Sequence, residues 1–359
     1  MTDAYSIDYF YGFSNSTAEI LVSVGNFMFT MTNVSEISQF YLAQIGFFSN
    51  LFHILVLTRK SMRTTSVNII MIGIGTCDFF NAIFILHSYV PSIFYGNCWN
   101  AHSYSYRFFN NWMQGINDAL HRVCAWLAIV MALIRYLVIK NYHNPRFEKL
   151  TKPLFGVKTI IFIFIISSFM SAFYYSYMKI YQLGIWEPSE KCGELSEEMY
   201  SVTIDVFNLI PYTILDGFLK IVPSVAFPLL TFLLVRELRK AKKRRMILGG
   251  SNNNQDHVTK MVTVMTVSSI LAEGPMGVAV IFQSLVYDQL GLFALSSDIT
   301  ATCYMFIAFN GCTHFIICLV VDRQYRDTAR KVLTCGFCKR KKTKVLPNFV
   351  LETTLPVVQ

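Results

Sequence analysis

The chain has 359 residues, of which 53% are hydrophobic and only 15% are charged. Soluble domains carry about a quarter charged residues, so this composition, with 31 Phe and 19 Tyr, excludes a single water-soluble core and indicates a membrane protein. The formal net charge of +9 does not indicate nucleic-acid binding, because the basic residues lie in short segments between apolar runs and no recognition motif accompanies them.

Residues 1–36 are expected to form an extracellular segment. Within it, Ile20 to Met31 is apolar but interrupted by small and polar residues. A membrane span needs about 20 mostly apolar residues, so this stretch is expected to lie against the extracellular surface. Sequons at Asn15 and Asn33 are candidate glycosylation sites.

Residues 37–321 contain seven stretches long and apolar enough to cross a bilayer as helices. The predicted class is therefore an all-α membrane protein with a seven-transmembrane helical bundle, followed by an amphipathic helix and a cytoplasmic tail over 322–359. Asp216 and Lys220 interrupt the fifth stretch, and no internal duplication suggests a transporter built from inverted repeats. The expected spans are 37–58, 67–90, 111–139, 156–181, 208–235, 258–286 and 296–321.

The distribution of Lys and Arg between the short loops predicts the orientation of the bundle. Basic residues follow the first, third, fifth and seventh spans, whereas the loop between the fourth and fifth spans is acidic. We therefore expect a plasma-membrane protein with an extracellular N-terminus and a cytoplasmic C-terminus. The acidic loop contains Glu187, Glu190, Glu194, Glu197 and Glu198.

Polar residues inside spans are costly and are functional candidates. Asn50 and Asp78 lie in the middle of the first and second spans. They are expected to form either a polar cluster that holds a sodium ion with water or a hydrogen-bond network that joins helices. The residues leave both interpretations open.

The third span carries ionisable residues at both ends. Asp118, His121 and Arg122 share one face, and Asp118 and Arg122, four residues apart, either pair with each other or contact a ligand. Arg135 and Tyr136 end the span at its cytoplasmic edge, before a basic loop.

The last two spans each carry a polar group. Glu273, Gly274 and Pro275 lie in the sixth span, where proline removes a backbone hydrogen bond and predicts a hinge beside a carboxylate. Asn310 and His314 share one face of the seventh span. The histidine is expected to bond a neighbouring helix, since no second metal ligand accompanies it.

The cysteines outside the spans allow two modifications. Cys335 and Cys338 precede the basic run 339–342, which predicts either palmitoylation with contact to anionic lipids or an unmodified tail. Their C-x-x-C spacing has no second pair that would complete a zinc site. Cys98 and Cys192 lie in extracellular loops and are a candidate disulfide.

Four blocks of the chain resemble the class W serpentine receptors of nematodes, which are similar to FMRFamide-type neuropeptide receptors within the rhodopsin-like superfamily. The resemblance covers all seven spans and is weak in the termini and extracellular loops. The blocks are LTRKSMRTTSVNIIMIGIGTCD at 57–78, HRVCAWLAIVMALIRYLVIKN at 121–141, AEGPMG at 272–277 and NGCTHFIICLVVDRQYR at 310–326.

The resemblance implies a G-protein-coupled receptor for a short RF-amide-like neuropeptide, or alternatively a chemosensory receptor for an environmental small molecule. It implies a sodium ion beside Asp78, and it matches Arg135 to the arginine of the D-R-Y motif. The other matched positions are the first-span Asn50, the bend prolines Pro223 and Pro275, and Tyr325-Arg326 at the start of an eighth helix.

The chain also departs from the family pattern. Ile134 replaces the acidic partner of Arg135, and Glu273 stands where a tryptophan is usual. The segment beginning at His314 lacks both the proline and the tyrosine of the N-P-x-x-Y motif. Cys98 lies further from Arg135 than the usual disulfide cysteine does.

The expected mechanism is ligand binding among the outer halves of the third, fifth, sixth and seventh spans, followed by an outward swing of the sixth. A transporter or channel is the less favoured alternative, and no H-E-x-x-H or paired-aspartate motif suggests an enzyme. Expected ligand contacts are Asp118, His121, Arg122, Glu273 and Tyr304. A heterotrimeric G protein is expected to meet Arg135, Tyr136, Arg239 and Lys240.

Overall fold

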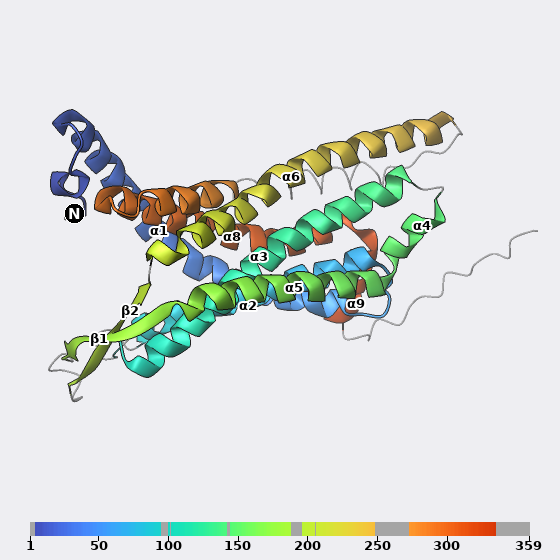
Figure 1. The fold of residues 1–359 in the computed structure, drawn as a ribbon. Coiled ribbons are helices and arrows are strands. Elements are labelled where there is room, and N and C mark those ends of the chain that lie inside the picture. Colours follow the sequence, from blue (N-terminus) through green and yellow to red (C-terminus); the bar gives the residue numbers. More distant parts are fainter. Residues whose placement is uncertain are drawn as a thin grey trace, which may run out of the picture.

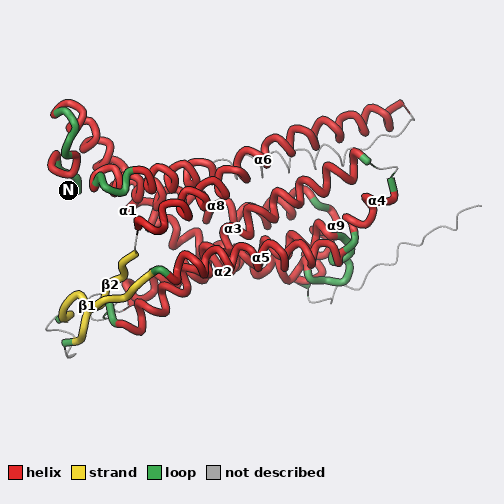
Figure 2. The backbone as a smooth tube through the Cα atoms, in the orientation of Figure 1, coloured by secondary structure: helices red, strands yellow, loops and turns green. Residues whose placement is uncertain are grey.

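The computed structural model describes residues 4–94, 100, 102–141, 144–187, 196–204, 206–247 and 273–334. Long helices run side by side along one axis, and a β-hairpin extends from one end of them (Figures 1 and 2). The helices are α1 (Asn15–Leu57), α2 (Ser66–Phe94), α3 (Tyr104–Lys140), α4 (Pro145–Glu148), α5 (Pro153–Ser176), α6 (Val206–Ile247), α8 (Leu290–Val321) and α9 (Arg323–Leu333). Short 3-10 helices are η1 (Ile7–Phe10) and η3 (Lys149–Thr151), and the strands are β1 (Met178–Trp186) and β2 (Glu197–Ile204).

Within the described residues, six helices are long and apolar enough to cross a membrane, namely α1, α2, α3, α5, α6 and α8. They coincide with six of the seven expected spans, although their ends differ. Most of the remaining expected span, 258–286, lies outside the described residues. Its part at 273–285 is helical.

The first helix is much longer than its predicted span, with 43 residues that begin at Asn15. The expectation that Ile20–Met31 lies as a separate segment against the extracellular surface is therefore wrong. The small and polar residues that interrupt this stretch are contact points for the chain that precedes the helix. A Cβ on Gly25 would lie 2.7 Å from the Tyr5 ring, and Asn26 Oδ1 accepts hydrogen bonds from the backbone N–H groups of Ala4 and Tyr5 at 3.0 and 3.1 Å.

The N-terminal residues fold back over one end of α1 and α8. Tyr5, Phe10 and Ala18 form a small buried cluster there, and the Tyr5 hydroxyl donates to Asp298 Oδ2 of α8 at 2.7 Å. Burial and this hydrogen bond hold the pKa of Tyr5 above its ordinary value. The N-terminus is thereby fastened to the last membrane helix.

Polar contacts also join α1 to α8 further along their length. Ser35 Oγ donates to the Ala301 carbonyl at 3.1 Å, and Gln39 Nε2 donates to the same carbonyl at 3.3 Å. Main-chain carbonyls in a membrane helix are satisfied within the helix, so these side-chain donors add links between helices.

The acidic loop between α5 and α6 forms an antiparallel hairpin that the sequence did not suggest. Its register runs from Met178 opposite Ile204 to Trp186 opposite Glu197, with an irregularity between Gln182 and Gly184. The Tyr200 N–H donates to the His102 carbonyl at 2.7 Å, which fixes the hairpin to the chain entering α3. Burial, assisted by Arg107, lowers the pKa of His102.

The main hydrophobic core lies toward the opposite end of the bundle, where α9 packs beneath the helices. Asp322 caps α9 by accepting from the Gln324 and Tyr325 N–H groups at 2.8 and 3.2 Å. The fully buried Tyr325 hydroxyl hydrogen-bonds to His53 Nδ1 of α1 at 2.8 Å. This contact connects α9 to the first helix as well as to α8.

Candidate functional site

Four charged side chains meet inside the bundle, between α3, α5 and α6. Arg122 Nη2 lies 2.6 Å from Asp118 Oδ2 and 2.7 Å from Asp216 Oδ1. Lys220 pairs with Asp216 Oδ2 and lies 3.5 Å from Asp118 Oδ1. Two carboxylates and two cations therefore balance each other within the apolar interior.

Arg122 is fully engaged by this cluster. Its Nε and Nη2 atoms donate to the two carboxylates, and Nη1 donates to the Ser167 carbonyl at 3.0 Å and Ser171 Oγ at 3.2 Å. The planar guanidinium thus bonds groups on three helices, a geometry that the compact ammonium of lysine does not reproduce. Arg122 acts in this arrangement as a structural centre.

Asp118 is the accessible member of the cluster. Its side chain is 21% exposed, against 2% for Arg122 and 9% for both Asp216 and Lys220. Asp118 Oδ2 accepts from Arg122 and from Ser171 Oγ at 2.8 Å, whereas Oδ1 has only the 3.5 Å contact with Lys220. One oxygen of a partly accessible carboxylate therefore remains open to a further donor.

The structure forms the Asp118–Arg122 pair that the four-residue spacing suggested, and it adds partners that the sequence reasoning missed. Asp216 and Lys220 were treated only as interruptions of the fifth span. Their own spacing of four residues in an apolar stretch was the available signal for a buried ion pair. The contributions of Ser167 and Ser171 had no comparable signal.

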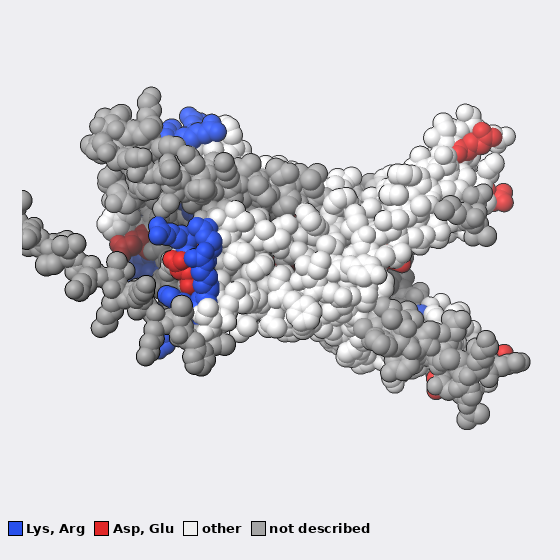
Figure 3. All heavy atoms as spheres, turned by 180° about the vertical axis from the view of Figure 1, so that it is seen from behind, with Lys and Arg blue, Asp and Glu red and all other residues white. Residues whose placement is uncertain are grey.

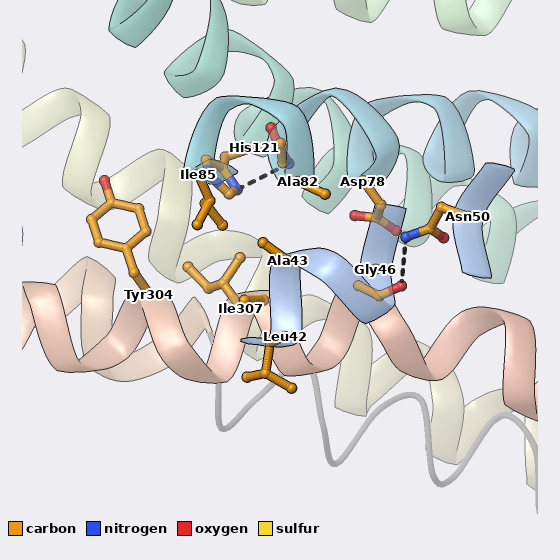
Figure 4. A pocket seen from close by; sticks show the side chains of 13 residues that line it. Leu42, Ala43, Gly46, Asn50, Asp78, Ala82, Ile85, His121, Tyr304 and Ile307 are labelled. Carbon is orange, nitrogen blue, oxygen red and sulfur yellow. Dashed lines mark hydrogen bonds between the residues drawn. The ribbon is translucent and has the colours of Figure 1, made fainter. Parts of the chain in front are cut away.

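A second polar region surrounds a cavity of about 30 Å³, enough for one or two waters and too small for an organic ligand. Asn50 Nδ2 donates to the Gly311 carbonyl at 3.2 Å, and Asn81 Nδ2 contacts His121 Nδ1 at 3.4 Å. Figure 4 places Asn50 and Asp78 toward one end of the cavity and Tyr304 at the other. Its lining residues are Leu42, Ala43, Gly46, Asn50, Asp78, Asn81, Ala82, Ile85, His121, Tyr304, Ile307, Ala308 and Gly311.

Glu273 does not share this cavity with His121 and Tyr304. It lines a second cavity of about 30 Å³, together with Asn310 and His314 of α8 and Pro223 of α6. Within the described residues, the Glu273 carboxylate has no hydrogen-bond or ion-pair partner. The remaining lining residues are Cys124, Ala125, Ala128, Ser224 and Phe227.

The four residues expected to form one polar network divide between these two cavities. Asn50 and Asp78 line the first, and Asn310 and His314 line the second. The connection between the cavities is a contact of 3.0 Å between His314 Nδ1 and Asp78 Oδ2. The histidine bonds a neighbouring helix, as its position suggested.

The residues expected to meet a G protein lie toward the α9 end of α3 and α6. Ile134 is buried, and in the described part of the chain no carboxylate pairs with Arg135. Tyr136 packs on Leu234 and Leu238 of α6, which joins the ends of the two helices. Further along α6, Arg239 is exposed and Lys240 pairs with Glu237 at 2.8 Å.

Several predicted sites lie outside the described residues. These are the candidate disulfide of Cys98 and Cys192 and the candidate palmitoylation sites Cys335 and Cys338. The sequon asparagines Asn15 and Asn33 are described, and both are exposed on α1.

Comparison with known proteins identifies the family. The family model described as the serpentine-type 7TM GPCR chemoreceptor Srw matches residues 37–336, which is most of the chain. The chain is 24% identical to the sex peptide receptor of Drosophila melanogaster over 337 residues, covering 86% of this chain and 74% of that protein. It is 22% identical to the G-protein coupled receptor dmsr-1 of Caenorhabditis elegans over 370 residues, covering 88% and 70% of the two chains.

These matches confirm the resemblance inferred from the four sequence blocks. They also confirm that the chain is a receptor and not an enzyme, since the family and both relatives are G-protein-coupled receptors. The chain belongs to the Srw family of serpentine G-protein-coupled receptors.

Proposed function

We propose that the receptor spans the plasma membrane seven times, with its hairpin and N-terminus outside and α9 along the inner surface. The charge distribution supports this orientation, because Lys and Arg gather at one end of the molecule and Asp and Glu at the other (Figure 3). The described basic residues near α4, α9 and the end of α6 include Arg59, Lys60, Arg63, Arg146, Lys149, Lys152, Arg236, Arg239, Lys240, Arg323, Arg326, Arg330 and Lys331.

We infer that the extracellular ligand is a short peptide that presents a hydrogen-bond donor, cationic or amide, to Asp118. The open Oδ1 atom of this partly accessible carboxylate is the observation that carries the inference. Glu187, Glu197 and Glu198 on the hairpin give the entrance a negative charge, which favours the approach of a basic peptide. One relative is named as a peptide receptor.

The expected pocket residues then have different roles. Asp118 binds the ligand directly, while Arg122 positions Asp118 and supports it against α5 and α6. His121 and Tyr304, whose ring centroids are 5.8 Å apart, lie below and respond to a shift of α3. Glu273 lies at the second cavity, beside the proposed hinge.

In this proposal, agonist binding moves the sixth span at Gly274 and Pro275 and opens the cytoplasmic end of the bundle. The lack of a carboxylate partner leaves Arg135 available to a heterotrimeric G protein, and the exposed basic groups near Arg239 extend the contact surface. The agonist shifts the equilibrium only through higher affinity for the open state.

The test is a screen of peptides on cells that express the full-length receptor with a promiscuous G protein. Amidated peptides with a basic residue should act, and their free-acid forms should be weaker because a carboxylate meets Asp118. Asp118→Asn should lower potency by about tenfold or more, since a hydrogen bond to a charged group contributes about 1.5–3 kcal/mol. Glu36→Gln, which changes an exposed carboxylate on α1, is the matched control.

Unchanged potency of Asp118→Asn at normal surface expression would refute the pocket. Silence to peptides with a response to small environmental molecules would favour the chemosensory alternative, which the description of the matched family also suggests. Loss of signalling in Arg135→Ala with retained ligand binding would support the proposed coupling surface.

A further inference from the structure

Both oxygens of the buried Asp78 carboxylate face side-chain donors from other helices. His314 Nδ1 of α8 lies 3.0 Å from Oδ2, and Cys124 Sγ of α3 lies 3.5 Å from Oδ1. The α8 backbone also approaches closely, because a Cβ on Gly311 would lie 3.3 Å from Asp78 Cγ and Oδ1. The carboxylate is therefore held between a nitrogen donor, a thiol and a glycine backbone.

This donor set does not fit the sodium ion that the family resemblance implies. Hard cations take oxygen ligands, and a thiol is a soft ligand that they do not prefer. Asn50 Oδ1 and Asn81 Oδ1 are buried acceptors without a partner in the first cavity, but water can satisfy them. The carboxylate itself, which a metal would need most, is already occupied by protein groups.

The surroundings of His314 favour a positive charge on its ring. Asp78 contacts it from α2, and Glu273 lines the same cavity from the helix 273–285. The other titratable groups nearby are Cys124 of α3 and His53 of α1, and His53 Nδ1 is bonded to Tyr325. Two carboxylates thus lie near one imidazole, and no Lys or Arg among the described residues lines either cavity.

We propose that protonated His314 is the counter-ion of Asp78, so that this polar core binds a proton in place of a sodium ion. The imidazolium contributes a charge-assisted hydrogen bond inside the bundle, which is stronger than a neutral one. When the imidazole loses its proton, Asp78 is left as a buried carboxylate without a counter-ion. The inactive packing of α2 against α8 is therefore most stable at low pH and weakens as pH rises.

The experiment measures the thermal unfolding midpoint of the purified full-length receptor in detergent without ligand. Buffers contain sodium, potassium or choline chloride at about 0.15 M, so that ionic strength is constant. The pH is varied over about 5 to 8, the range in which histidine side chains change charge. Wild type, His314→Asn and Asp78→Asn are compared, with His87→Asn as a control for removal of another histidine from a membrane helix.

The midpoint of wild type should fall as pH rises and should be the same in the three salts. His314→Asn should lose this pH dependence and gain stabilisation by sodium, because the internal cation is removed and an amide oxygen is added. His87→Asn should behave as wild type, and Asp78→Asn should respond to neither variable.

A saturable stabilisation of wild type by sodium that Asp78→Asn abolishes would overturn the proposal. So would a wild-type midpoint indifferent to both sodium and pH, since the imidazole would then be neutral. Because the wild-type protein alone decides between these outcomes, poor folding of a variant does not rescue the proposal.

Discussion

Gly217 of α6 and Gly277 of the helix 273–285 face each other backbone to backbone. A Cβ on either residue would lie 3.2 Å from the carbonyl oxygen of the other, and a Cβ on Gly277 would lie 3.0 Å from the Ile221 nitrogen. Close approach of small residues is how membrane helices pack without large side chains between them. This contact fixes the upper part of the helix that is proposed to swing.

Gly277→Ala should therefore separate the two helices and destabilise the receptor by about 1–3 kcal/mol, the usual range for overpacking. Gly274→Ala is the matched control, because its Cβ would meet Ser224 at an ordinary 3.7 Å. Thermal unfolding of the purified variants measures the effect. Equal midpoints for the two variants would show that the glycine contact does not determine the packing.

Arg122→Lys should behave as a severe substitution although it keeps the charge. Lysine cannot reach Asp118, Asp216, Ser167 and Ser171 together, so buried partners lose their hydrogen bonds. Breaking such a buried network costs about 3–5 kcal/mol. Surface expression and the thermal midpoint should both fall, whereas Lys240→Arg at the exposed Glu237 pair should change neither.

Tyr325→Phe removes one hydroxyl from the junction between α9 and α1. His53 Nδ1 then remains buried without its partner, at an expected loss of about 1–3 kcal/mol. Backbone hydrogen exchange of α9 should rise in this variant. The double variant His53→Leu with Tyr325→Phe should recover part of the protection, because it leaves no unsatisfied polar atom.

Tyr5→Phe tests the attachment of the N-terminus. The raised pKa of Tyr5 means that its neutral hydroxyl is stabilised in the fold, and this contribution is fully present below the ordinary tyrosine value and lost only as pH rises above it. The variant should expose the N-terminus to protease, with the same increase at any pH between about 6 and 9. A difference that disappeared within this range would contradict the assigned contact.

The sequence could predict those parts of the structure that depend on local spacing or on membrane thickness. Six described spans lie where apolar length placed them, and the Asp118–Arg122 pair follows from one helical turn. The choice of partners between helices could not be predicted in this way. Lys220 faces Asp118, and His53 faces Tyr325, only because distant helices pack in one particular order.

The same limitation explains the errors at the N-terminus. Gly25 and Asn26 look like helix breakers when membrane thickness is the only guide. In the fold they receive Tyr5 and cap the chain before the helix, so the interruptions are contacts. The β1–β2 hairpin was missed for a related reason, since strand pairing depends on residues far apart in the chain.

The length of α1 has a mechanical consequence. A helix of 43 residues measures about 64 Å, roughly twice the hydrocarbon thickness of a bilayer. Its outer half is a rigid lever continuous with the first span, so a tilt of about 5° within the membrane displaces the tip by roughly 3 Å. A fluorophore attached at the exposed Glu19 would report small rotations of the first helix as measurable distance changes, without any label inside the bundle.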